Sequence, residues 1–433
     1  MSASPKKYPA DATELIVESK LVEDGLTFSQ AEKDHLRSLA GTVAELSVQP
    51  IESEKRDLWL RHNMLQSTRP LVFCDPEGSW REIVPDESLQ CENTFARDWE
   101  FNLRAKIFRG KEMRDDRTID PYFDVSHVRT GYDWGLEAKI IGAGRGNAYR
   151  WDPPVKTEAD IAKLHFPTFK IDTAGTERLA EIAEEIFGDL LSVRIKSSWW
   201  WSLGMTNYLV NLRGLDQILF DMLDNPQILH AIMSVLSSGF MALLDALTER
   251  KLLSLNCDGS YVGSGGFGWT DELPQADFDG TVRPCDMWGF AESQETVGVS
   301  QDMFEEFVLR YQLPILSRFG LNCYGCCEPV DDRWEAVKKV PNLRRISVSP
   351  WSKPEKMAAY LGQQYIYSMK PNPSDLAMDN FDEARIRQKM RNEFQTTRNC
   401  IVEAIMKDTH TIRNDPTRVI RWVQITKEEA EKL

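Results

Sequence analysis

From residue 71 onward, short apolar runs rich in β-forming residues alternate with segments of helical periodicity. A helix between consecutive strands makes those strands parallel, and eight parallel strands close most readily into a barrel. We therefore predict an α/β fold, a (β/α)8 TIM barrel spanning residues 69–433. The eight runs are Leu71–Cys74, Leu190–Lys196, Leu252–Cys257, Asp286–Phe290, Leu321–Cys326, Arg344–Ser349, Tyr365–Met369 and Ile401–Met406.

The segments between the runs carry helix start signals. Asn225-Pro226 combines a capping residue with proline at the first helical position, and apolar residues then recur at helical spacing as far as Leu247. Ser300 precedes acidic residues that suit the first turns of another helix. Asp415-Pro416 marks the start of the last one. These signals support the strand–helix alternation.

Two parts of the chain lie outside the alternation. Residues 1–68 predict an N-terminal helical extension, with helices at Ser29–Leu46 and Ile51–Leu65. Residues 76–170, after strand 1, are too long for a structureless connection and predict an insertion that covers the substrate. Within it, Gly142–Asn147 is rich in glycine, but a Trp-Asp-Pro-Pro run follows where a nucleotide-binding helix should begin. We interpret it as a turn.

Charge excludes several classes of partner. The chain has 67 acidic and 52 basic residues, a formal charge of −15. Polyanions are repelled by such a chain, so we expect no binding to nucleic acid or to anionic membranes. The N-terminus lacks the apolar core of a signal peptide, and the most apolar stretch, Ala231–Leu247, contains serines and Asp245, as a buried helix does. We expect a cytoplasmic protein whose eight cysteines are thiols.

Reactive side chains follow several of the predicted strands. In a parallel barrel the carboxyl ends of the strands share one edge, where catalytic groups gather. Asp258 precedes a loop with five glycines in residues 259–268, a loop suited to covering a ligand. We take Asp258, Tyr324 and Lys370 as candidate catalytic residues. The wider strand-end set also includes Glu292, Cys326, Cys327, Glu328 and His410.

Cysteine, histidine and glutamate are the usual ligands of zinc, and a catalytic zinc needs three of them plus an open position. The candidate metal ligands are Glu292, Cys326, Cys327, Glu328 and His410. The alternative is that strand ends are merely polar and that the clustered cysteines are small buried side chains.

Three adjacent tryptophans, 199–201, follow the second predicted strand and cannot all face the core. Trp199 and Trp200 are candidate substrate contacts, because an indole offers an apolar wall. Gly265 and Phe267 of the glycine-rich loop complete that predicted set. Packing of the tryptophans against the insertion is the alternative.

Over residues 55–430 the chain resembles the uroporphyrinogen decarboxylase superfamily. The resemblance rests on the strand order, on Asp258 before its glycine-rich loop, on the ending of the fifth strand and on Asp415-Pro416-Thr417. Decarboxylases of that superfamily carry an arginine-rich N-terminal segment, whereas residues 69–76 here read RPLVFCDP. The zinc-dependent, corrinoid-linked methyltransferases carry His-x-Cys on the fifth strand and a cysteine after the eighth. Here Tyr324-Gly-Cys326 and His410 occupy those places.

The resemblance implies an altered zinc site with Cys326 and His410, completed by Glu292, Glu328 or Cys327. It implies a methyltransferase of the O-demethylase type, which moves a methyl group from a small methylated substrate, such as an aryl methyl ether, to a separate corrinoid protein as methylcobalamin. Zinc would act as a Lewis acid, and Tyr324 or a carboxylate would supply a proton. The chain has no Asp-x-His-x-x-Gly signature, so the corrinoid would be carried by another protein.

Two other functions stay open. One is metal-free decarboxylation, with Asp258 stabilising a protonated intermediate. The other is a non-catalytic barrel that binds a small molecule. A homodimer is one possible assembly, because barrels of this kind often pair.

Overall fold

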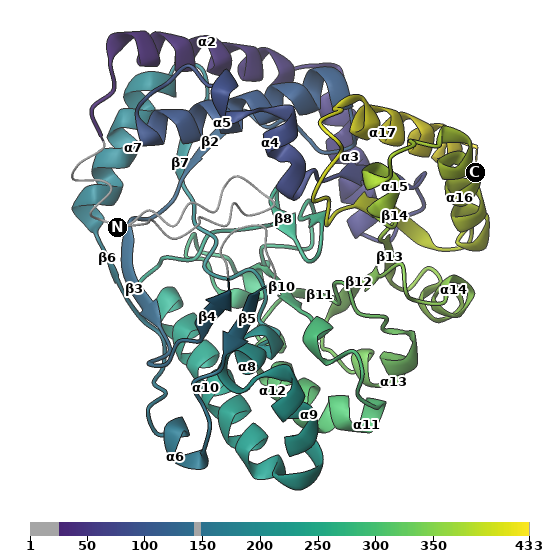
Figure 1. The fold of residues 1–433 in the computed structure, drawn as a ribbon. Coiled ribbons are helices and arrows are strands. Elements are labelled where there is room, and N and C mark those ends of the chain that lie inside the picture. Colours follow the sequence, from purple (N-terminus) through teal and green to yellow (C-terminus); the bar gives the residue numbers. More distant parts are fainter. Residues whose placement is uncertain (1–25, 143–148, 433) are drawn as a thin grey trace.

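The computed structural model describes residues 26–142 and 149–432. Its centre is a parallel six-stranded sheet with the order β1-β14-β13-β12-β11-β10 (Figure 1). The last strand therefore lies beside the first, as it does when strands and helices wind around a barrel axis. The strands are β1 (Leu71–Cys74), β10 (Trp288–Ala291), β11 (Leu321–Tyr324), β12 (Leu343–Val348), β13 (Ile366–Met369) and β14 (Ile401–Met406).

Seven of the eight predicted runs contain strands, but the described residues form no continuous eight-stranded ladder. The second run forms β7 (Ser192–Ile195), which pairs with β2 (Tyr122–Val125) in a separate sheet. The prediction of a strand at 252–257 is wrong. There the Asn256 side chain bonds both the amide and the carbonyl of Trp288, at 2.8 and 3.0 Å, in place of a backbone ladder. The fold is mixed α/β and TIM-like in strand order.

The two faces of the sheet differ in chemistry. One face carries apolar residues such as Val72, Ala404 and Met406, which belong to the main core under the helices. The other carries Phe73, Arg345, Glu403 and similar side chains. A hairpin of β8 (Tyr261–Val262) and β9 (Gly266–Phe267) lies against this second face, which we call the inner face. The glycine-rich loop thus packs against the sheet.

The helices begin and end close to the predicted positions. The helices of at least seven residues are α2 (Gln30–Ser47), α3 (Pro50–Asn63), α5 (Thr94–Phe108), α7 (Thr173–Phe187), α8 (Thr206–Arg213), α9 (Leu215–Asp224), α10 (Pro226–Glu249), α12 (Arg310–Leu316), α14 (Pro354–Leu361), α16 (Glu383–Thr396) and α17 (Thr417–Ala430). Helix α10 is long and apolar enough to cross a membrane by length and composition, but half of that apolar window is buried. It packs against α9 and α12, as a core helix does.

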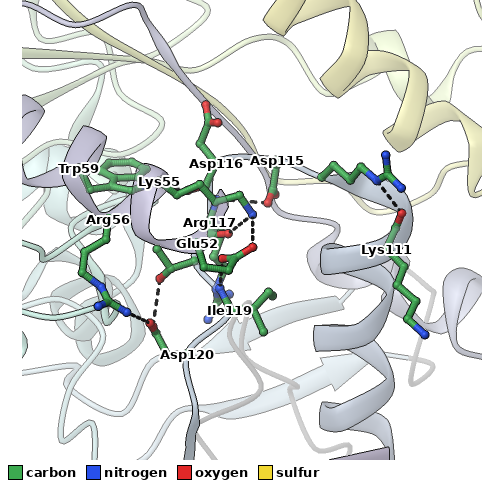
Figure 2. A network of polar contacts seen from close by, with 12 residues as sticks. Glu52, Lys55, Arg56, Trp59, Lys111, Asp115, Asp116, Arg117, Ile119 and Asp120 are labelled. Carbon is green, nitrogen blue, oxygen red and sulfur yellow. Dashed lines mark hydrogen bonds and ion pairs between the residues drawn. The ribbon is translucent and has the colours of Figure 1, made fainter. Parts of the chain in front are cut away.

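The N-terminal helices pack on the rest of the fold, and residues 1–25 of the predicted extension lie outside the described residues. Figure 2 shows how α3 is joined to the segment that leads into β2. Glu52 accepts hydrogen bonds from Lys55 (2.9 Å) and from the amide of Ile119 (2.6 Å), while Lys55 also donates to the carbonyl of Arg117 (3.1 Å). This buried contact fixes α3 beside the start of the insertion.

The predicted insertion is more regular than its sequence indicates. It contains α5, which runs alongside α2 (Figure 1), and strands of two antiparallel pairs. Those pairs are β3 (Arg129–Asp133) with β6 (Thr168–Ile171), and β4 (Lys139–Gly142) with β5 (Tyr149–Asp152). The turn predicted at Gly142–Asn147 lies outside the described residues beyond Gly142.

Candidate functional site

Two adjacent cysteines lie at the carboxyl end of β11, facing the end of β14. Gly325, at φ +89°, turns the chain after β11 into the Cys326-Cys327 pair. The Cys326 sulfur lies 3.6 Å from the Cys327 sulfur, 3.2 Å from the Ser264 hydroxyl oxygen and 3.9 Å from the Lys407 side-chain nitrogen. Lys407 also donates to Ser264 at 3.1 Å. We call Cys326, Cys327, Ser264 and Lys407 the thiol cluster.

The thiol cluster favours a thiolate at one position. The hydrogen bond from the Cys327 thiol and the charge of Lys407 lower the pKa of Cys326 although burial opposes them. The same bond and burial raise the pKa of Cys327, whose thiol also lies 3.3 Å from a carboxylate oxygen of Asp408. Burial lowers the pKa of Lys407, but the surrounding anionic groups outweigh it and hold this pKa well above its usual value. A protonated lysine therefore faces the more acidic thiol.

Two buried glutamates stand behind the cysteines. Glu328 accepts hydrogen bonds from the backbone amides of Ser293 (2.8 Å) and Cys326 (2.9 Å), so it joins the ends of β10 and β11. Glu292 accepts from the hydroxyl of Ser202 (3.1 Å) and from the amide of Gln294 (2.9 Å). Burial and the nearby carboxylates raise the pKa of Glu292 well above its usual value. Burial therefore favours the neutral acid form of Glu292 over the carboxylate.

No three of the predicted metal ligands, all within the described residues, lie close enough together to bind one metal ion. Both Glu328 oxygens accept backbone hydrogen bonds, and His410 is exposed beside Gly78. Within residues 26–142 and 149–432, no group of three or more His, Cys, Asp or Glu side chains is arranged to hold a metal ion. As placed, the donors do not fit zinc, which stays a prediction. All eight cysteines are free thiols, as predicted.

The predicted catalytic residues lie in different surroundings. Tyr324 is fully buried, and its hydroxyl donates to Gln312 at 2.8 Å on the helix side of the sheet. Asp258 accepts from Arg194 (3.1 Å) and Lys196 (2.8 Å), and these cations lower its pKa although burial raises it. Lys370 lies on the inner face, close enough to Cys326 for their charges to interact. Of the three, Lys370 is the one electrostatically linked to the thiol cluster.

Most of the predicted substrate contacts are packed against other side chains of the protein. Trp199 donates its indole N–H to the carbonyl of Leu252 (3.0 Å) and stacks beside Phe169 of the insertion, at 5.3 Å between ring centroids. Trp200 is partly buried in the main core. Phe267 is buried against Phe73. The Trp199 ring therefore packs against the insertion, and a role in substrate binding stays a prediction.

The inner face also holds a buried polar network, of which only Lys370 was predicted from the sequence. Glu403 accepts hydrogen bonds from Arg345 (2.9 and 3.2 Å) and Ser368 (2.5 Å), and its other polar contact is His62 Nε2 at 3.0 Å. Lys370 donates to Ser368 at 2.6 Å. We call these five residues the inner-face network. The two-residue spacing of Glu403, Ile405 and Lys407 was the signal, because it puts two charged side chains on one face of β14.

Tyr261 was also missed. It lies on the hairpin, and its hydroxyl oxygen is buried without a hydrogen-bond partner among the described residues. Its pKa is raised by burial and responds to the charges of Lys407 and Cys326. A buried hydroxyl without a partner is a polar group available to a ligand at the thiol cluster.

No family model matches the chain, and no curated protein matches it. Among solved structures, a methyltransferase from Methanosarcina mazei is similar, with a TM-score of 0.48 and 9% sequence identity. The alignment covers 87% of this chain and 97% of that one. At this level of similarity the match supports no inference about activity, so function has to be argued from the site.

Proposed function

We propose that the chain is a methyltransferase in which Cys326 takes a methyl group from a small methylated substrate. The observation that carries the proposal is the thiol cluster, in which a lowered thiol pKa persists at a side chain that is 3% exposed. The thiolate is the nucleophilic form of cysteine, and a neighbouring lysine ammonium stabilises it.

The proposed reaction needs a nucleophile and an acid. The Cys326 thiolate attacks the methyl carbon of an ether or amine, so that a sulfur–carbon bond forms while the carbon–oxygen or carbon–nitrogen bond breaks. The departing heteroatom takes the bond's electron pair and a proton. Glu292, whose neutral acid form is favoured by burial, donates that proton. The products are S-methylcysteine at Cys326 and the demethylated substrate.

The acceptor in this proposal is a corrinoid carried by a separate protein. The corrinoid would supply a nucleophilic acceptor for the methyl group on sulfur, and Cys326 would return to its thiolate form as the methyl group leaves. The resemblance of the sequence to corrinoid-linked methyltransferases supports this choice. An aryl methyl ether is the proposed donor.

The experiment follows methyl transfer to free cob(I)alamin by absorbance, with methoxyphenols, methylamines and methyl thioethers as donors. A parallel sample without cobalamin is analysed by intact mass for a single added methyl group. We expect one donor class to be active and Cys326→Ser to abolish both signals. Glu292→Gln should slow ether cleavage by about 10²-fold, the usual contribution of a positioned general acid to the rate.

Cys400→Ser is the matched control. Its thiol is half-buried at the start of β14, 3.6 Å from the carbonyl of Ala358, and has no contact with the thiol cluster. Equal activity of Cys326→Ser and wild type would overturn the proposal. Release of CO2 from a carboxylated substrate, lost in Asp258→Asn, would establish the decarboxylase instead.

A further inference from the structure

Lys370 is a buried lysine that forms no ion pair among the described residues. It follows β13, where its backbone amide donates to the carbonyl of Val348 at 2.9 Å. The side chain is 5% exposed, and its one hydrogen bond in the described part of the chain is to the hydroxyl of Ser368. Buried lysines are ordinarily paired with a carboxylate, so this arrangement needs a reason.

Glu403, the carboxylate of the inner-face network, already has other hydrogen-bond partners. Glu403 is contacted by Arg345, His62 and Ser368. Ser368 has a single hydroxyl proton, which it gives to Glu403, so towards Lys370 its oxygen can only accept. When Lys370 is neutral, Ser368 therefore accepts a hydrogen bond from one of its N–H groups, and the nitrogen lone pair has no partner in this network.

The charges that face Lys370 come from several elements. Glu403 on β14 and Cys326 after β11 favour its ammonium form, while Lys407 after β14 and Arg345 on β12 oppose it. Burial is the largest effect, and together they lower the pKa of Lys370 to about 7. A lysine that is desolvated and close to other cations holds a substantial share of free amine near neutral pH.

We propose that Lys370 is a nucleophilic amine that forms an imine with a small oxo acid at the carboxyl end of the sheet. An oxo acid suits the position because its carbonyl carbon can meet the amine, while its carboxylate faces the cationic Lys407 of the same face. The inference goes beyond methyl transfer and does not depend on it.

The chemistry balances without a further reactant. The neutral Lys370 nitrogen adds to the carbonyl carbon, and the carbonyl oxygen leaves as water with both amine protons. A carbon–nitrogen double bond remains. Its protonated form withdraws electrons from the neighbouring carbon, as a lysine imine does in covalent catalysis.

The experiment traps the imine. Full-length protein is incubated with pyruvate or acetoacetate, reduced with borohydride, digested, and mapped by mass spectrometry. We expect label at Lys370, none at that site in Lys370→Met, and unchanged Lys370 labelling in Lys338→Met. Lys338 is an exposed lysine whose side chain is 44% accessible. Circular dichroism confirms that the methionine variants are folded.

The pH profile separates a nucleophile from a structural lysine. The rate of labelling at Lys370 should reach half its maximum near pH 7. Lys407→Met removes a repelling cation, so it should raise the pKa of Lys370 and move the profile to higher pH. Absence of label at Lys370 with both probes up to alkaline pH would overturn the inference. So would equal total labelling in wild type and Lys370→Met. Neither readout uses a methyl donor, so failure of methyl transfer would leave this result intact.

Discussion

The side-chain nitrogen of Lys407 lies 3.9 Å from the sulfur of Cys326, and the hydroxyl of Ser264 contacts both. The three residues come from three different segments: the end of β14, the loop after β11 and the glycine-rich hairpin. The hairpin therefore supplies part of the thiol cluster and does more than cover it. Displacing any one of the three segments should change the reactivity of the sulfur.

Lys407→Met should raise the pKa of Cys326, because a nearby cation that stabilises the thiolate is removed. We expect alkylation of Cys326 by iodoacetamide near neutral pH to slow by roughly tenfold, the equivalent of about one pKa unit. The measurement is the pH profile of modification, read at Cys326 by peptide mass. Lys407→Arg should restore most of the rate, and an unchanged profile in Lys407→Met would contradict the assignment.

Glu403→Gln should strongly destabilise the fold. The substitution leaves the guanidinium of Arg345 buried without its carboxylate, and breaking one side of a buried ion pair costs about 3–5 kcal/mol. Urea unfolding measures the change in the free energy of unfolding. Ser368→Ala, which removes one hydrogen bond of the same network, should cost only about 1 kcal/mol. Comparable losses in the two variants would show that the charge of Glu403 matters little.

Strand and helix positions were largely predictable because they depend on local patterns. The runs at Leu71–Cys74 and Ile401–Met406 are strands with the predicted bounds, and Asn225-Pro226 does begin a helix. The prediction of a strand at 252–257 rested on apolar residues that fit a strand. In the structure, the Asn256 side chain instead makes the hydrogen bonds to the amide and carbonyl of Trp288. A side chain that replaces a ladder bond leaves no periodic signal.

The sequence pattern placed the candidate residues at strand ends, but it did not indicate which of them contact one another. The carboxyl ends of β10, β11 and β14 do gather carboxylates, thiols and a lysine. His410 was predicted as a metal ligand from its side-chain chemistry, yet the thiol cluster contains Lys407, three residues earlier. Residues 408, 413 and 414 adopt positive φ angles, so the chain turns away from the site after β14. That backbone change could not be inferred from side-chain chemistry.

Asp116 should make stability depend on acid pH. It is buried and bonded to Arg69 (2.8 Å through each oxygen) and to Lys427 (3.0 Å). Burial raises its pKa, but these cations outweigh it and lower the pKa to about 2. Since the folded pKa lies below the unfolded value, the stabilisation is complete above pH 5 and is lost as the pH falls from about 5 towards 2.

The lowering of the Asp116 pKa from its ordinary value of 3.8 to about 2 corresponds to about 2.5 kcal/mol. Unfolding free energies at pH 7, 4 and 3 follow it, and Asp116→Asn should reduce the loss of stability between pH 7 and pH 3 by about half of this amount, about 1 kcal/mol. Asp57→Asn is the control, because Asp57 is an exposed aspartate on α3. If Asp57→Asn and Asp116→Asn changed the loss of stability at acid pH equally, the ion pairs of Asp116 with Arg69 and Lys427 could not be its cause.

Gly265→Ala should disturb the thiol cluster through the backbone. Gly265 has φ +119°, and a Cβ placed there would meet a methyl carbon of Ile405 at 2.5 Å. The strained backbone and this clash together should cost roughly 2–4 kcal/mol. They should also shift the adjacent Ser264 and slow iodoacetamide modification of Cys326. Gly280→Ala separates the two effects, since Gly280 has φ +96° and a Cβ placed there would meet no atom of the described residues within 4 Å apart from its chain neighbours. It should show the strain alone, with wild-type reactivity at Cys326, and slower modification in both variants would refute a specific role of the hairpin.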